Sequence, residues 1–198
     1  MANKKEDKTI EKEDKINPNH YKGLKNLYVV SPTEVKQAQV IDIIEYYTDD
    51  LIGGAATNFG NVLKYLCRFN LKSHDSYQSS QKEKNLEELK KVSWYMSRLN
   101  DFCHNKIYRV CSNYIAKPCI LSREDKFING PLNCLDILVV YDAIKDNYPV
   151  ECREALCEAF AKMQFFLKEG NSGKAEDYLK EIETHLNDVV NIYSSLRD

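Results

Sequence analysis

The chain has 198 residues, of which 43% are apolar and 29% are charged, and its formal net charge is −2. This composition provides enough apolar side chains for a buried core and excludes an intrinsically disordered chain. No apolar run approaches the roughly 18–20 residues of a membrane span, and residues 1–15 lack the apolar segment of a secretory signal. We therefore expect a cytoplasmic protein with no membrane partner. A pI near 6.1 argues against general nucleic-acid binding, which usually requires a basic domain.

Glycine and proline are scarce, with seven and five residues, whereas residues that favour helices are abundant. The composition therefore predicts an all-α fold rather than a turn-rich β fold. The cysteines are odd in number and form no C-x-x-C pair, and the four histidines lie far apart in the sequence. We expect free thiols packed as small apolar groups, without a local pattern of metal ligands. The seven cysteines are Cys67, Cys103, Cys111, Cys119, Cys134, Cys152 and Cys157.

The N-terminal part of the chain begins with a charged tail and continues into a first helix. Residues 1–16 carry five basic and five acidic side chains and little to bury, which predicts a solvated tail. Residues 31–34, Ser-Pro-Thr-Glu, supply capping hydroxyls, an early proline and an acidic side chain, as at a helix start. The apolar residues that this helix turns toward a core are Val35, Ala38, Ile41 and Ile44, with Tyr47 as a further candidate.

Two further helices complete the first half. The second begins either at Asp49 or at Thr57, because Gly53 and Gly54 weaken its first turn. Its apolar face consists of Phe59, Val62, Leu63, Leu66 and Phe69. A polar loop over residues 73–81 precedes the third helix, over about residues 84–103. The third helix buries Leu86, Leu89, Val92 or Ser93, Met96 and Leu99.

We expect residues 17–105 to form a small helical domain, residues 106–130 a linker, and residues 131–198 a C-terminal annex of three helices. The annex helices are expected over residues 132–146, 150–168 and 172–196, packed against the first half or against another subunit. The annex carries seven basic and thirteen acidic side chains, whereas residues 17–130 have a net charge of +4. A basic half attracts an anion, and an acidic half suppresses binding of polyanions.

The polar face of the second helix is the main candidate site, because the sequence contains no P-loop and no G-x-G-x-x-G, H-E-x-x-H or G-x-S-x-G motif. Lys64, Arg68 and Lys72 recur at every fourth residue, and Asn61 and Tyr65 flank them. Lysine and arginine bind phosphate, and an aromatic ring stacks on a base. An ordinary solvated face has the same pattern, so both interpretations stay open. The phosphate-binding and the solvated-face interpretations both place Lys64 and Arg68 away from the apolar face of the helix.

Two other pairs of residues are ambiguous. Trp94 and Tyr95 on the third helix are typical of a core or an interface as well as of a ligand site. Asp42 and Glu45, three residues apart on the first helix, form a weak candidate pair for a metal such as Mg²⁺. Two acidic side chains at that spacing more often face water.

Several runs of the sequence together match a family pattern. They are Pro18-x-His20-Tyr21, Ile41-Asp42-Ile43-Ile44-Glu45, Gly60-Asn61-x-x-Lys64-Tyr65-x-x-Arg68, Lys72, and Glu88-Leu89-Lys90-Lys91-Val92-x-Trp94-Tyr95. The pattern resembles a short bacteriophage domain family of unknown function, which is similar to the C-terminal part of the nucleotide kinase of podovirus-type coliphages. That kinase has no P-loop. The resemblance covers about residues 17–100, and residues 101–198 have no counterpart in it.

The resemblance implies a nucleotide partner, nucleoside monophosphate kinase-like phosphoryl transfer, and a location in the host cytoplasm. It implies catalytic roles for His20, Lys64 and Arg68, with the two cations neutralising phosphate charge and His20 acting as an acid, a base or a hydrogen-bond donor to phosphate. Tyr21 or Tyr65 would stack on the base. The nucleotide-binding residues that it implies are Tyr21, Asn61, Lys64, Tyr65, Arg68 and Lys72.

Three classes of function remain open: a nucleotide kinase, a non-catalytic protein that sequesters a nucleotide or a nucleotide signal, and a helical adaptor that binds a host protein through the acidic annex. Enzymatic turnover separates the first from the second, and absence of nucleotide binding would leave the third. We also expect a homo-oligomer, because a first half of about 85 residues has a limited core of its own.

Overall fold

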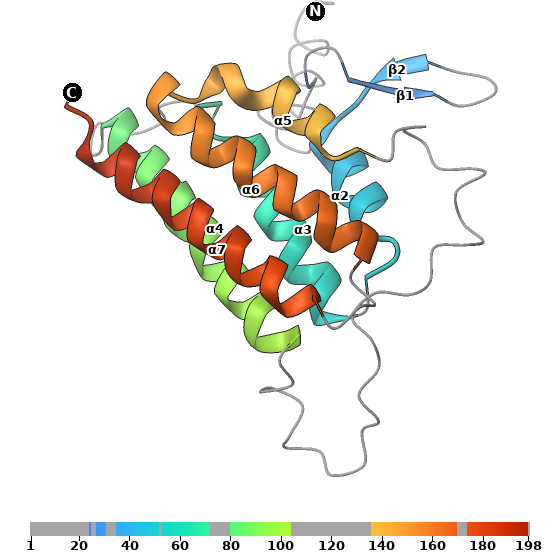
Figure 1. The fold of residues 1–198 in the computed structure, drawn as a ribbon. Coiled ribbons are helices and arrows are strands. Elements are labelled where there is room, and N and C mark those ends of the chain that lie inside the picture. Colours follow the sequence, from blue (N-terminus) through green and yellow to red (C-terminus); the bar gives the residue numbers. More distant parts are fainter. Residues whose placement is uncertain are drawn as a thin grey trace, which may run out of the picture.

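The computed structural model describes residues 24, 27–30, 35–51, 53–71, 80–103, 136–169 and 174–197. These residues are mostly helical, which confirms the predicted all-α class (Figure 1). The predicted tail, the loop over residues 73–79 and the linker over residues 106–130 lie outside them. The helices are α2 (Val40–Thr48), α3 (Gly54–Cys67), α4 (Gln81–Cys103), α5 (Leu138–Ile144), the 3-10 helix η3 (Lys145–Asn147), α6 (Val150–Glu169) and α7 (Ala175–Ser195).

The predicted start of the first helix at residues 31–34 lies outside the described residues, and the helix expected to follow it is wrong over Val35–Gln37, which form a strand. Strand β1 (Tyr28–Val30) pairs with β2 (Val35–Gln37), with Val30 opposite Val35. β-branched and aromatic residues such as Tyr28, Val29, Val30 and Val35 favour extended backbone. Helix α2 begins only at Val40, where the Gln39 backbone N–H donates to the Asp42 carboxylate over 2.7 Å.

This later start also changes which residues of α2 face the core. Val40, Ile43 and Tyr47 are buried, whereas Ile41 is exposed. The predicted inward residues Val35 and Ile41 therefore lie outside, and Ala38 is buried just before the helix. The set of inward-facing residues is displaced by about one position from the predicted set. One position is enough to turn a side chain away from the core, because neighbouring side chains on a helix point about 100° apart.

Helices α3 and α4 match the predicted apolar faces closely. All five residues predicted for the inner face of the second helix are buried, Phe69 just beyond the end of α3. On α4 it is Val92 rather than Ser93 that is buried, and Leu86, predicted to be buried, is only partly so. Helix α3 begins at Gly54, between the two alternatives taken from the sequence, and Gly53 before it has a φ of 54° that suits glycine. Helix α3 packs against both α2 and α4.

Gly60 lies in the buried face of α3, where that helix approaches α2 most tightly. A Cβ atom at Gly60 would lie 3.0 Å from Ile44 Cγ2 and 3.5 Å from Thr48 Cγ2. We expect Gly60→Val to lower the free energy of unfolding by about 1–3 kcal/mol, because the added methyl groups overpack this contact. Urea unfolding gives the measurement. Thr57→Val, at an exposed position of α3, is the control and should change the free energy of unfolding by less than about 0.5 kcal/mol. Equal effects of Gly60→Val and Thr57→Val would contradict this account.

The C-terminal helices pack against the first half rather than standing apart from it. Figure 1 shows α7 lying along α4 and α6, and α6 crossing over α3. The Phe59 and Phe166 ring centroids are 5.9 Å apart, and the Tyr148 hydroxyl donates to the Leu66 carbonyl over 2.9 Å. The two halves thus share one hydrophobic core. None of the described helices has the length and apolar character needed to cross a membrane.

Candidate functional site

The polar surface formed by α3 and α4 brings together most of the candidate residues. Side chains three and four residues apart share one side of a helix. Because α3 packs against α4, the polar side of the last turns of α3 lies beside the polar side of the middle of α4. We call this surface the α3–α4 face. It consists of Asn61, Lys64, Tyr65 and Arg68 from α3 and its C-terminal cap, and of Glu87, Glu88, Lys91, Trp94, Tyr95 and Arg98 from α4.

A buried ion pair lies at the base of this face. Arg68 Nε donates to Glu88 Oε2, and Lys91 Nζ donates to Glu88 Oε1 over 3.2 Å. Arg68 is 8% exposed and Glu88 is 4% exposed. The expectation that Arg68 lies on a solvated face, away from the packed interior, is therefore wrong. Glu88 on the neighbouring helix draws the guanidinium inward, since a buried charge requires a partner.

The same contacts set the pKa of the Glu88 carboxyl. Burial alone would raise this pKa, because it disfavours the charged form. The hydrogen bonds and charges of Arg68 and Lys91 outweigh burial, so the pKa lies below its ordinary value and Glu88 is ionised at neutral pH. Lys91 also contacts Glu87 over 2.7 Å, and its bonds to the two glutamates raise its pKa despite partial burial.

Lys64 has a different environment. Its Nζ donates to Asn61 Oδ1 over 2.7 Å, while Asn61 Nδ2 donates to the Thr57 carbonyl over 2.8 Å and so fixes the amide. Within the described part of the chain no carboxylate lies within ion-pair distance of Lys64. Burial, followed by the nearby charge of Arg68, lowers the pKa of Lys64; the charge of Glu88 opposes this shift, and that of Lys91 adds to it. Among the residues that the structure describes, the ammonium thus has a neutral hydrogen-bond partner and lies beside other cations.

An aromatic row runs across the face from α3 to α4. The Tyr65 ring has Arg68 Cζ at 4.3 Å and Lys64 Nζ at 4.7 Å from its centroid. Tyr65 stacks on Tyr95 with 5.6 Å between centroids, and Tyr95 meets Trp94 edge-on at 4.7 Å. Burial raises the pKa of the Tyr65 hydroxyl. These contacts predict a rigid aromatic surface beside the cations.

The outer end of the row is accessible. Trp94 is 54% exposed, and Arg98 Cζ lies 5.0 Å from the centroid of its ring. Arg98 follows Trp94 by one helical turn, so the guanidinium and the indole meet on one side of α4. The residues that define the face include four cations and two carboxylates, which leaves an excess of positive charge.

Asp42 and Glu45 do not join the α3–α4 face. Asp42 accepts the hydrogen bond that begins α2 and lies 4.0 Å from Lys36, whereas Glu45 is exposed. The described residues contain no group of three or more His, Cys, Asp or Glu side chains suited to a metal ion. The Asp42 carboxylate thus has a structural role in capping the helix. The predicted site residues His20, Tyr21 and Lys72 lie outside the described residues.

Four cysteines lie in the described residues, and all four are free thiols. Burial raises the pKa of Cys67 to about 12 and that of Cys152 to about 11, so neither forms a reactive thiolate at neutral pH. Cys103 and Cys157 are half-buried, and Cys111, Cys119 and Cys134 fall outside the described part.

Sequence reasoning missed four residues of the face: Glu87, Glu88, Lys91 and Arg98. Glu87 and Lys91 stand four residues apart, as do Trp94 and Arg98, and this spacing predicts contact on a helix. The spacing was therefore a usable signal for Lys91 and Arg98. The pairing of Glu88 with Arg68 had no such signal, because the two lie twenty residues apart on different helices.

Comparisons of this chain with protein-family models, with curated proteins and with solved structures find no match. The resemblance to the phage family has no support from them. A functional interpretation rests on the contacts of the α3–α4 face.

Proposed function

We propose that the α3–α4 face binds the phosphate group of a nucleotide and that Lys64 is its main contact. The environment of the Lys64 ammonium is the observation that supports this proposal. It is half-buried, its hydrogen-bond partner Asn61 is neutral, and burial together with the charges of Arg68 and Lys91 lowers its pKa against the opposing charge of Glu88. A phosphate beside Lys64 would supply the negative charge that this ammonium lacks and would offset the repulsion among the cations.

The other two cations have a supporting role in this proposal. Arg68 and Lys91 both donate to Glu88, so a phosphate that contacts either must compete with a carboxylate already in place. Their charges still attract an anion to the face, because electrostatic attraction does not require direct contact. Asn61 acts as a positioning residue, since its amide holds the Lys64 ammonium.

Phosphoryl transfer between nucleotides is the reaction that the family resemblance implies for such a site. Cations that bind phosphate also stabilise the charge of a transferred phosphoryl group. Sequestration of a nucleotide without catalysis requires only the binding step. Incubation of the protein with ATP, Mg²⁺ and each nucleoside monophosphate separates the two, because only a kinase forms the nucleoside diphosphate.

Replacement of Lys64 by methionine tests the proposal directly. Methionine keeps most of the side-chain length but removes the ammonium. We expect nucleotide affinity to fall about ten- to a hundredfold, since a charge-assisted hydrogen bond contributes about 1.5–3 kcal/mol. The melting temperature without ligand should stay the same or rise, because the lowered pKa shows that folding disfavours the Lys64 charge. Isothermal titration calorimetry with nucleoside mono-, di- and triphosphates, together with thermal unfolding, provides both measurements.

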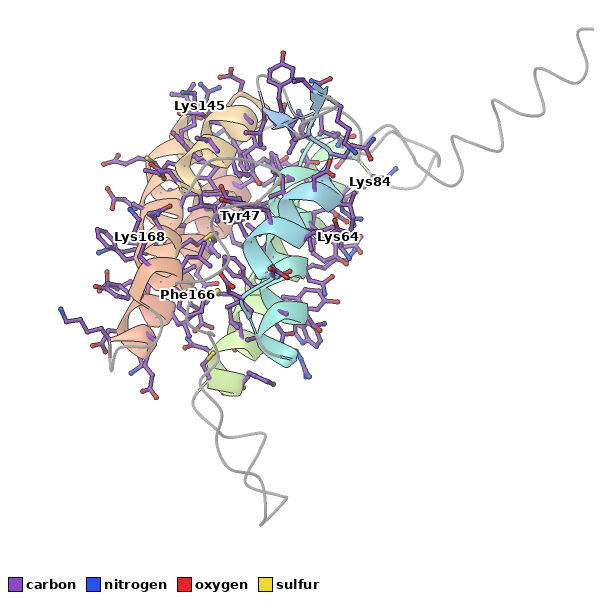
Figure 2. The ribbon with its side chains drawn as sticks, turned by 90° about the vertical axis from the view of Figure 1, so that its right-hand side faces the viewer. Tyr47, Lys64, Lys84, Lys145, Phe166 and Lys168 are labelled. Carbon is purple, nitrogen blue, oxygen red and sulfur yellow. The ribbon has the colours of Figure 1, made fainter. Side chains whose placement is uncertain are left out.

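Lys168→Met is the matched control. Lys168 is an exposed lysine of α6, and Figure 2 shows it on the side of the molecule opposite Lys64. Lys168→Met removes the same charge as Lys64→Met does, but on the opposite side of the molecule. Its nucleotide affinity should therefore remain within about twofold of the wild-type value. Equal affinity loss in both variants would indicate a general effect of net charge. Unchanged affinity in Lys64→Met would contradict the proposal, and absence of all nucleotide binding by the wild-type chain would favour the adaptor function.

The pH dependence of binding has a defined sign. The ammonium form of Lys64 is the form that binds phosphate, and its pKa in the folded protein lies below the ordinary value of 10.5. Affinity should therefore decline as the pH rises through this lowered pKa, at a lower pH than for an ordinary lysine. In Lys64→Met, the same alkaline decline should be absent.

A further inference from the structure

The aromatic row gives the α3–α4 face a second type of binding surface beside its cations. Tyr65 and Tyr95 are half-buried, and their rings lie stacked against each other. Trp94 at the end of the row is exposed over more than half of its surface. A large exposed indole, fixed between Tyr95 and Arg98, is a ready surface on which a flat aromatic group can stack.

The indole and the phosphate-binding cations lie close enough for one small ligand to reach both. Trp94 follows Lys91 by three residues on α4, a rise of about 4.5 Å along the helix axis. Across the face, steps of 4.7, 5.6 and 4.7 Å lead from Trp94 through Tyr95 and Tyr65 to the Lys64 ammonium. These short steps bring the indole within the length of an extended nucleoside di- or triphosphate from Lys64.

We propose that Trp94 stacks on the base of the ligand whose phosphate contacts Lys64, so that the face selects a mononucleotide over an inorganic phosphate. This inference rests on the proposed function. Arg98 covers part of the indole and holds its orientation. The base stacks on the exposed part of the ring, and the phosphates extend along α4 toward Lys64 and Lys91.

A single-stranded nucleic acid also combines bases with phosphates, but the face fits one nucleotide better. A polynucleotide groove needs several exposed rings along a basic track. Only one ring of this row, Trp94, is largely exposed, and the whole chain carries a net charge of −2. An oligonucleotide therefore serves as a competing ligand in the test.

Trp94 is the only tryptophan of the chain, so its fluorescence reports on this position without any label. The full-length protein is titrated separately with ADP, GDP, CDP and UDP, with inorganic tripolyphosphate, and with a ten-residue oligothymidylate. We expect at least one nucleoside diphosphate to change the Trp94 emission at saturation and to bind at least tenfold more tightly than tripolyphosphate.

The Trp94→Leu variant then separates the base from the phosphate. Its affinity for the preferred nucleoside diphosphate, measured by calorimetry, should fall on the order of tenfold, the size of effect typical for loss of one base–aromatic stack. Its affinity for tripolyphosphate should stay within twofold of wild type, and Trp94→Phe should recover part of the nucleotide affinity. Phe165→Leu, at an exposed aromatic residue of α6, is the control and should bind as wild type does.

The outcomes distinguish this inference from the proposed function. If Trp94→Leu binds nucleoside diphosphate as tightly as wild type, base stacking at Trp94 is wrong while phosphate binding at Lys64 stands. If neither nucleotide nor tripolyphosphate binds the wild-type chain, the proposed function fails and the inference fails with it. If oligothymidylate binds far more tightly than every nucleoside diphosphate, the ligand class is wrong.

Discussion

We expect Glu88→Ala to lower the free energy of unfolding by about 3–5 kcal/mol, as is typical when one partner of a buried ion pair is removed. Glu88 is buried and accepts hydrogen bonds from both Arg68 and Lys91. Its loss deprives the buried Arg68 guanidinium of this carboxylate and brings the cations of the face into stronger repulsion. Denaturant unfolding at neutral pH measures the effect.

Glu87→Ala is the matched control for this prediction. Glu87 contacts the same lysine, Lys91, but its side chain is 66% exposed. Loss of such a surface pair should cost no more than about 1 kcal/mol. A double variant, Arg68→Leu with Glu88→Leu, should recover much of the stability, because apolar side chains often replace a buried ion pair well. Equal losses in Glu87→Ala and Glu88→Ala would contradict the burial of this pair.

The lowered pKa of Glu88 adds a pH dependence to this prediction. A carboxyl whose folded pKa lies below its unfolded pKa stabilises the fold above the unfolded value, and this stability disappears as the pH falls through the folded value. The contribution of Glu88 is therefore complete at neutral pH. It should decline below about pH 4.5, toward the lowered pKa. The stability difference between wild type and Glu88→Ala should narrow over the same range.

We expect Phe69→Ala to be equally damaging, with a loss of about 3–5 kcal/mol. Phe69 is buried just beyond α3 and stacks on Tyr148 with 4.1 Å between ring centroids. It also meets Tyr193 of α7 edge-on at 5.2 Å. Truncation therefore opens a cavity at the point where the first half of the chain contacts the C-terminal helices.

Phe165→Ala is the control, because Phe165 is exposed and stacks only on Tyr178 at 5.6 Å among the described rings. Its loss should cost about 1 kcal/mol. The shared core predicts a single transition for wild type, seen alike by Trp94 fluorescence and by far-ultraviolet circular dichroism. Two separate transitions, with Phe69→Ala affecting only one, would contradict a core shared by the two halves.

Helical periodicity was sufficient to predict most of the fold. The predicted helices over residues 150–168 and 172–196 correspond to α6 and α7, and the apolar stripe of α7 contains Leu179, Ile182, Leu186 and Val189, all buried. Long amphipathic helices repeat the same signal over several turns, which makes it robust. Of the helix predicted over residues 132–146, residues 132–135 lie outside the described residues, and α5 covers Leu138–Ile144 with η3 following it.

The errors arose where long-range contacts decide the structure. The hairpin before α2 depends on pairing between β1 and β2, and local helix-start signals do not reveal such pairing. Arg68 stands on the polar side of its own helix, yet Glu88 from α4 makes that position buried. Gly60 and Glu88 both belong to the runs that suggested a family, and both have clear packing or ion-pair roles in this structure.

The candidate site could be predicted only in part, because spacing along one helix is visible in the sequence whereas contacts between helices are not. The spacing of Asn61 and Lys64 on one helix correctly placed them together, and their hydrogen bond confirms that arrangement. The distinction between Lys64, with a neutral partner, and Arg68, with a carboxylate partner, depends on α4 and is not visible in the sequence of α3. This distinction is the reason why we propose Lys64, rather than Arg68, as the main phosphate contact.

The most direct test of phosphate binding at Lys64 is nuclear magnetic resonance of protein labelled at the lysine side chains, with the Lys64 signal assigned from the Lys64→Met variant. The Lys64 signal is followed as the pH is raised, once without ligand and once with saturating nucleoside diphosphate. A phosphate at the ammonium should shift the Lys64 signal and raise its pKa from its lowered value, while the Lys168 signal stays in place. A Lys64 signal and pKa that remain unchanged in the saturated protein would contradict the account.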